Sequence, residues 1–111
     1  MDVPTIAEER AELSIESGLS YREDEPVVVR LRKRGGRYDL DDEGRAVALA
    51  GKPQGWRERA VEVVDGEFSL NVSRGGAVFV PAVEGGVDLA WLAGRAAEAS
   101  WALYQELLDL E

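Results

Sequence analysis

The sequence predicts an α+β fold, in which two antiparallel β-hairpins form a small sheet that packs against a long C-terminal helix and one or two shorter helices. Residues 27–40 and 68–83 predict the hairpins, because each stretch has alternating hydrophobic residues around a Gly-Gly pair. Residues 87–110 predict the long helix, because hydrophobic residues recur there at helical spacing. With 111 residues, the chain is expected to form a single domain, residues 1–111.

Residues 1–25 are expected to form an acidic N-terminal helix and a connector. Thr5 and Glu8 have the spacing of a capping box, and Gly18 follows the expected end of the helix. Pro26 disfavours helix in the residue before it, so residues 19–26 are expected to be a solvent-exposed connector.

The first hairpin is expected to run from Val27 to Leu40, with its turn at Gly35-Gly36. The predicted register places Arg32 opposite Asp39 and Leu31 opposite Leu40. Asp41-Asp42 then offers an N-cap for a short helix over residues 43–50, with Val47 and Leu49 facing inward.

A second short helix is predicted from Trp56 to Val64, ending at Asp65-Gly66. The second hairpin follows, and Pro81 in its second strand favours an edge position because proline lacks a backbone N–H donor.

The C-terminal helix is expected to carry two hydrophobic stripes that together span about 220°, more than one core contact requires. One stripe is expected to meet the sheet, and the other to meet the N-terminal helix or another chain. Trp91 falls on the polar side of the helix, where an exposed indole is unusual. Four residues therefore form a candidate protein interface: Trp91, Trp101, Tyr104 and Leu108.

The chain contains no cysteine and no histidine, which excludes thiolate nucleophiles, imidazole bases and the usual zinc sites. The acidic cluster of Asp39, Asp41, Asp42 and Glu43 has carboxylates of the kind that bind Mg²⁺ or exchange protons. Strand pairing and helix capping account for the same residues. The sequence therefore assigns no catalytic, cofactor-binding or metal-ligating residue and favours a protein without catalytic activity, with a metal-dependent carboxylate enzyme as the second alternative.

Residues 30–37 form a basic stretch in a chain whose net charge is −9. Its arginines are candidate phosphate contacts, and they make a nucleic-acid-binding module the first alternative function: Arg30, Arg32, Arg34 and Arg37. A charged hairpin whose edge is protected from pairing explains the same pattern.

The N-terminus has no signal-peptide pattern, and no run of about 18 hydrophobic residues is present, so we expect a cytoplasmic protein without membrane partners. The preference for arginine over lysine, with abundant alanine, glycine and valine, is typical of a GC-rich bacterial genome.

Residues 26–111 resemble a family of short bacterial and phage-encoded proteins of unknown function. The family pattern is a hydrophobic strand, a glycine turn, then Leu-x-Asp-Asp-x-Gly and a short helix; here the strand begins at Val27 and the motif occupies Tyr38 to Gly44. The chain departs from the family by inserting Glu43 before Gly44, where the motif often runs Asp-Asp-Gly directly. The resemblance implies an accessory, regulatory or defence-related role and transfers no functional residue.

Taken together, these patterns favour a protein-interaction or regulatory module, either a homodimer through the C-terminal helix or a chain that binds another protein, such as an inhibitor or antitoxin-like protein.

Overall fold

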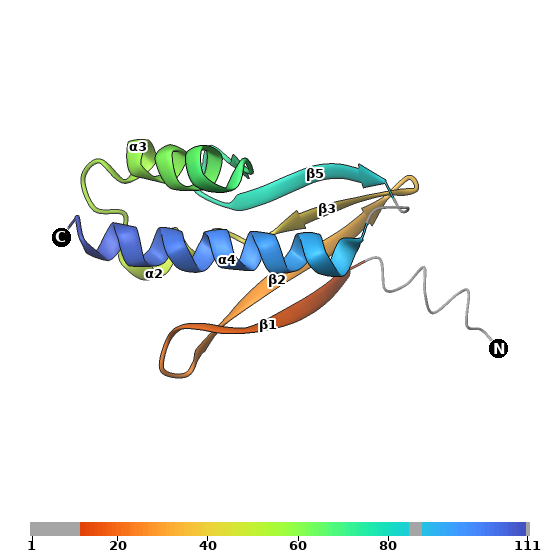
Figure 1. The fold of residues 1–111 in the computed structure, drawn as a ribbon, viewed down its shortest axis with the longest axis horizontal. Helices are drawn as coiled ribbons and strands as arrows, with labels where there is room; N and C mark the ends of the chain where they lie inside the picture. Colours follow the sequence, from red (N-terminus) through yellow and green to blue (C-terminus); the bar gives the residue numbers. More distant parts are fainter. Residues whose placement is uncertain (1–11, 85–87, 111) are drawn as a thin grey trace.

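The computed structural model describes residues 12–84 and 88–110, which form a five-stranded antiparallel sheet in the order β1-β2-β3-β5-β4 together with helices (Figure 1). The predicted α+β class is confirmed, but the sheet has five strands and is not built from the two predicted hairpins alone. The strands are β1 (Glu12–Arg22), β2 (Glu25–Arg34), β3 (Arg37–Asp41), β4 (Asn71–Val72) and β5 (Val78–Glu84).

Strand β1 occupies residues that the sequence assigned to the end of a helix and to a connector, and that prediction was wrong. Leu13 lies opposite Leu31 of β2 and Ile15 opposite Val29, so the two strands bring their hydrophobic residues together. The connector is only a tight turn, in which Asp24 adopts φ 68°, a left-handed conformation that aspartate tolerates better than most residues. The predicted capping box at Thr5 and Glu8 lies outside the described residues.

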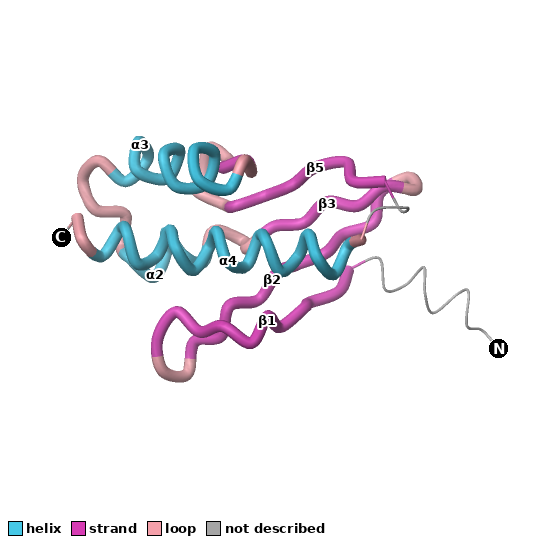
Figure 2. The backbone as a smooth tube through the Cα atoms, in the orientation of Figure 1, coloured by secondary structure: helices cyan, strands magenta, loops and turns pink. Residues whose placement is uncertain are grey.

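The β2–β3 hairpin matches its prediction in turn and register. Arg32 pairs with Asp39 and Leu31 with Leu40. Gly35 and Gly36 both have positive φ, the geometry that a two-residue hairpin turn requires. This turn and the β1–β2 turn lie at opposite ends of the sheet (Figure 2).

Strand β5 pairs with β3 along most of its length but with β4 only at Val78 and Phe79. Strand β5 lies between β3 and β4 and is therefore not the edge strand that was predicted, but Pro81 lies beyond the short β4, where its missing N–H donor breaks no β4 pairing. Near it the β3–β5 register shifts, and the Ala82 backbone N–H donates to Asp39 Oδ1 at 2.9 Å.

The helical elements are α2 (Arg45–Ala50), α3 (Trp56–Ala60), the π-helical segment η1 (Val61–Glu67) and α4 (Leu89–Leu108). Helix α2 begins two residues later than predicted, and its N-cap is Gly44 rather than Asp41 or Asp42. The predicted 56–64 helix continues to Glu67, so Gly66 lies inside it and does not end it. The long C-terminal helix is confirmed, and the Asp88 side chain caps it by accepting from the Trp91 N–H.

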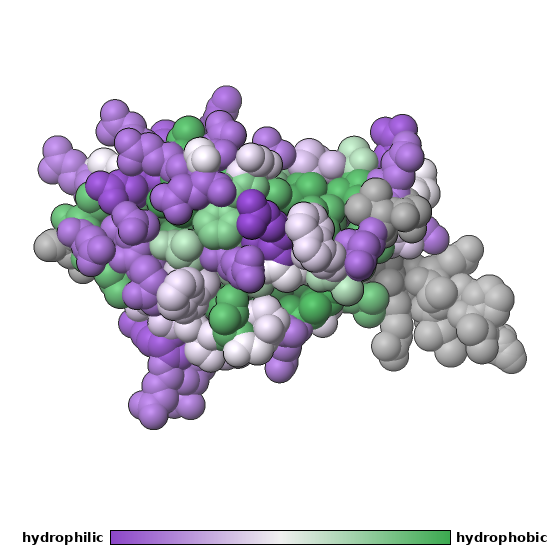
Figure 3. All heavy atoms as spheres, viewed as in Figure 1, coloured by the Kyte–Doolittle hydropathy of each residue, from purple (hydrophilic) through white to green (hydrophobic). Residues whose placement is uncertain are grey.

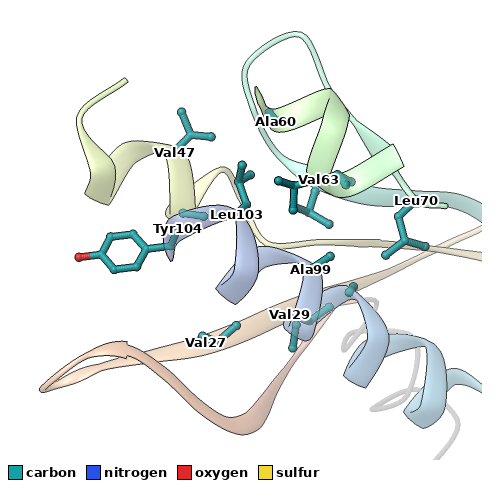
Figure 4. Packing of buried hydrophobic residues seen from close by; sticks show 14 of the residues in the cluster. Val27, Val29, Val47, Ala60, Val63, Leu70, Ala99, Leu103 and Tyr104 are labelled. Atoms are coloured by element: carbon teal, nitrogen blue, oxygen red, sulfur yellow. The ribbon is translucent and has the colours of Figure 1, made fainter. Parts of the chain in front are cut away.

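The core lies between α4, the sheet and the shorter helices (Figures 1 and 4). Ala99 of α4 lies near Val29 of β2, whereas Leu103 lies on the side of α4 that faces Val47 of α2 and Val63 of η1 (Figure 4). Small side chains let α4 approach its neighbours closely: Ala93, Ala96, Ala97 and Ala99 are all buried.

Candidate functional site

The arginine hairpin places its guanidinium groups beside carboxylates of the same chain. Because strand side chains alternate between faces, Val29 and Leu31 enter the core while Arg30 and Arg32 lie on the opposite face. Arg32 Nη1 lies 2.8 Å from Asp41 Oδ2, and Arg30 Nη2 lies 2.9 Å from Glu43 Oε2.

Arg37 Nη2 lies 3.9 Å from Glu84 Oε2. The structure describes the backbone of Arg34 in β2 but not its side chain. Phosphate binding at this hairpin would have to compete with the three carboxylates. The geometry gives the nucleic-acid alternative little support.

The four residues of the candidate protein interface separate into two groups. Trp91 is 63% exposed, while Trp101 and Leu108 are each 39% exposed. Tyr104 is buried, because its ring packs edge-on against Tyr21 with centroids 5.4 Å apart. Tyr104 therefore belongs to the core and not to the predicted interface. Its partner comes from β1, the strand that the sequence did not predict.

A shallow hollow of about 240 Å³ lies beside Trp91 on the outer side of α4. Figure 3 views the molecule from the side of α4 and shows hydrophilic side chains interspersed with less polar ones on this surface. The hollow is lined by Ala90, Trp91, Gly94, Arg95 and Glu98.

A second feature, which the sequence did not reveal, is the buried carboxyl group of Asp42. The side chain is only 2% exposed. Oδ1 accepts from the backbone N–H groups of Gly44 at 2.8 Å and Val78 at 2.9 Å. Oδ2 accepts from the Ser100 hydroxyl at 2.5 Å, and the Tyr21 hydroxyl lies 2.6 Å from Ser100. Asp42 therefore links the β3–α2 connection to β5 and, through Ser100, to α4 and β1.

Burial dominates the ionisation of this network. It raises the pKa of Asp42 from 3.8 to about 6, even though the hydrogen bonds from Ser100, Gly44 and Val78 oppose the shift. Burial also raises the pKa of Tyr21, so this hydroxyl stays protonated at neutral pH. With Tyr21 donating to Ser100 and Ser100 donating to Asp42, the three side chains form one directed chain of hydrogen bonds.

Asp42 also lines an open pocket of about 230 Å³, together with Glu25, Pro26, Val28, Glu43 and Arg45. Arg45 Nη2 donates to Glu25 Oε2 at 2.8 Å, and this bond lowers the pKa of Glu25. Both Asp42 oxygens already accept hydrogen bonds from the chain itself. The carboxyl group thus has the geometry of a structural link between elements.

The acidic cluster predicted around Asp39 does not converge on a common point. Asp39 binds the Ala82 N–H, Asp41 binds Arg32, and Asp42 faces the interior. Within residues 12–84 and 88–110, no three carboxylates gather as metal ligands would. The metal-dependent alternative therefore receives no geometric support from the described residues.

The helices of the described ranges all lack the combination of length and hydropathy that crossing a lipid bilayer demands. Searches of protein-family models, curated proteins and solved structures returned no match to this chain. The resemblance to short bacterial and phage proteins stays a prediction.

Proposed function

We propose that this chain is a protein-interaction module that binds a partner protein through an exposed surface of its C-terminal helix. We call this surface the α4 face. At about 100° per residue, its residues fall within an arc of roughly 100°. All six are exposed: Ala90, Trp91, Gly94, Glu98, Trp101 and Leu108.

The observation that carries the proposal is the exposure of Trp91, at 63%. Tryptophan is among the residues most enriched at the energetic centres of protein interfaces, and a solvated indole contributes little to folding. Trp56, by contrast, is half-buried and lies beneath the charged groups of Lys52 and Arg57. Trp56 thus makes contacts within the chain, whereas most of the Trp91 side chain is exposed to solvent.

The extent of the α4 face supports the same function. Trp91 and Leu108 are separated by about 26 Å at the rise of 1.5 Å per helical residue. Trp101, 39% exposed, lies between them. A partner that covered this length would engage both indoles, and paired aromatic anchors are typical of specific interfaces.

Affinity capture from the native host tests the proposal. The tagged chain, a Trp91→Ala/Trp101→Ala variant and a Val61→Ala control are compared after nuclease treatment. Val61 suits the control because it is an exposed hydrophobic residue that belongs to η1 and not to α4.

We expect the wild type and the control to retain one stoichiometric protein that the double variant loses. Recovery of that protein at equal levels with the double variant would contradict the proposal. Material that disappears on nuclease treatment would instead favour the arginine hairpin.

A further inference from the structure

Three residues of α4 set the chemistry of the hollow beside Trp91. Trp91, Gly94 and Glu98 follow one another at intervals of three and four residues, so their side-chain positions lie on one side of the helix. The exposed indole lies at one end and an exposed carboxylate at the other. Gly94 lines the hollow between them and has no side chain to fill it.

Gly94 has no evident role in folding. Glycine inside a helix costs about 1 kcal/mol relative to alanine. A Cβ atom built at Gly94 meets nothing within 4 Å, and the backbone is not in the left-handed region. Neither close packing nor conformation within the described chain therefore requires glycine here. Because Gly94 has no side chain, the space beside the Trp91 indole stays open.

The two charged residues of the hollow differ in their partners. Arg95 is directed toward η1 and the segment that follows it, because its guanidinium lies 4.9 Å from the centre of the Phe68 ring and donates to the Phe68 carbonyl at 3.4 Å. Glu98 forms no ion pair with any residue in the described ranges. Arg95 keeps its positive charge but is turned toward Phe68, so the Glu98 carboxylate is the charged group of the hollow that has no partner among the described residues and is left for a ligand to pair with.

We infer that the hollow binds the cationic side chain of an arginine or lysine in a basic segment of the partner protein. The cation would lie over the Trp91 ring and pair with the Glu98 carboxylate, a combination of cation–π and ionic attraction. Trp56, with Arg57 at 4.8 Å from its ring centre, already makes the first of these contacts within the chain.

The net charge of the chain favours a basic partner over a second copy. At −9, two copies repel each other, whereas a cationic segment is attracted from a distance. This inference rests on the proposed function, because it specifies the partner of the same α4 face.

Peptide titration followed by NMR tests the inference. The probes are blocked octapeptides of alternating glycine and arginine, with a glycine–glutamate peptide as the charge-reversed control. The signal is the indole N–H of Trp91, assigned by its loss in Trp91→Ala. We expect saturable shifts with the arginine peptide and none with the glutamate peptide.

Three matched variants separate the site from general charge attraction. We expect Glu98→Gln to weaken binding at least fivefold, while Glu58→Gln, which removes an exposed carboxylate on α3, changes it less than twofold. Gly94→Ala should raise the melting temperature and still weaken binding at least fivefold, because its methyl group enters the hollow.

The inference is overturned if Glu58→Gln and Glu98→Gln weaken binding equally, if the glutamate peptide binds as well as the arginine peptide, or if the chain dimerises through α4 in sedimentation experiments. Loss of a captured partner in the Trp91→Ala/Trp101→Ala variant without arginine-peptide binding would refute this inference alone. Retention of the partner by that variant would refute the proposed function.

Discussion

The Ser100 hydroxyl donates a 2.5 Å hydrogen bond to the buried carboxylate of Asp42, and so joins the middle of α4 to the connection between β3 and α2. The backbone N–H of Val78 in β5 binds the other oxygen of the same carboxylate. The Asp42 side chain thus connects elements that are distant in sequence. These hydrogen bonds help to fix the inner side of α4 against the rest of the fold, so that its outer side faces solvent.

Replacement of Asp42 by alanine should lower the free energy of unfolding by about 3 kcal/mol, because two buried donors and one partly buried donor would lose their acceptor. The donors are the Gly44 and Val78 N–H groups and the Ser100 hydroxyl. Urea denaturation measures the effect. Asp65→Ala removes an exposed carboxylate and should change stability by less than about 0.5 kcal/mol. Equal effects of the two substitutions would refute the structural role of Asp42.

The stability of the chain should depend on pH through Asp42. Its pKa is about 6 in the folded chain and 3.8 ordinarily, so between these values the folded state binds the proton more tightly than the unfolded state. Protonated Asp42 therefore stabilises the fold at low pH, and this contribution is lost as pH rises through about 6.

The Asp42→Asn variant has no titrating group at this position. Relative to this variant, the free energy of unfolding of the wild type should fall by about 3 kcal/mol between pH 3.5 and pH 7. Urea denaturation of both proteins at both pH values measures this difference. The contributions of the other carboxylates to the pH dependence cancel, because both proteins contain them. A constant difference across the range would contradict the raised pKa.

The Tyr21–Ser100–Asp42 chain should behave as one unit. Ser100→Ala is expected to lower the free energy of unfolding by about 2 kcal/mol, and Tyr21→Phe by about 1 kcal/mol. Each substitution leaves a buried polar group without its hydrogen-bond partner. The double variant should cost less than the sum, because Ser100→Ala already removes the bond that Tyr21 makes. Additive effects in the double-mutant cycle would show that the two residues act independently.

Gly76 should tolerate no side chain, whereas its neighbour Gly75 should. At Gly76 φ is +100°, and an added Cβ would lie 3.0 Å from Val47 Cγ2 and 3.1 Å from the Trp56 ring. Gly76→Ala is expected to cost about 2–4 kcal/mol through strain and overpacking. At Gly75 the Cβ meets nothing within 4 Å, so Gly75→Ala should change the melting temperature little. Similar melting temperatures for the two variants would contradict the packing at Gly76.

The sequence predicted the elements whose signals are local. Gly35-Gly36 fixed the first hairpin and its register, and helical spacing revealed α4. Strand β1 was missed although Leu13, Ile15, Leu19 and Tyr21 alternate with polar residues. Gly18 was interpreted as a helix end, whereas it lies at positive φ in the irregular part of β1. The β1–β2 turn contains Glu23-Asp24 and not a pair such as Gly-Gly or Asn-Gly, so no two-residue hairpin signal marked it.

The buried role of Asp42 could not be predicted in the same way. Next to Asp41 and ahead of a short helix, it has the pattern of a capping residue. Its burial depends on Val78 and Ser100, 36 and 58 positions away in the sequence. Trp91, by contrast, was singled out correctly as an exposed indole, because helical spacing alone places it on the polar side of α4.

Site-specific photo-crosslinking in the native host tests whether the partner protein binds at the α4 face. A benzophenone amino acid replaces Trp91 in one chain and the exposed Val61 of η1 in another. We expect one dominant protein adduct from position 91, identified by mass spectrometry, and no such adduct from position 61. Equal adducts from both positions, or an adduct only from position 61, would contradict binding through the α4 face.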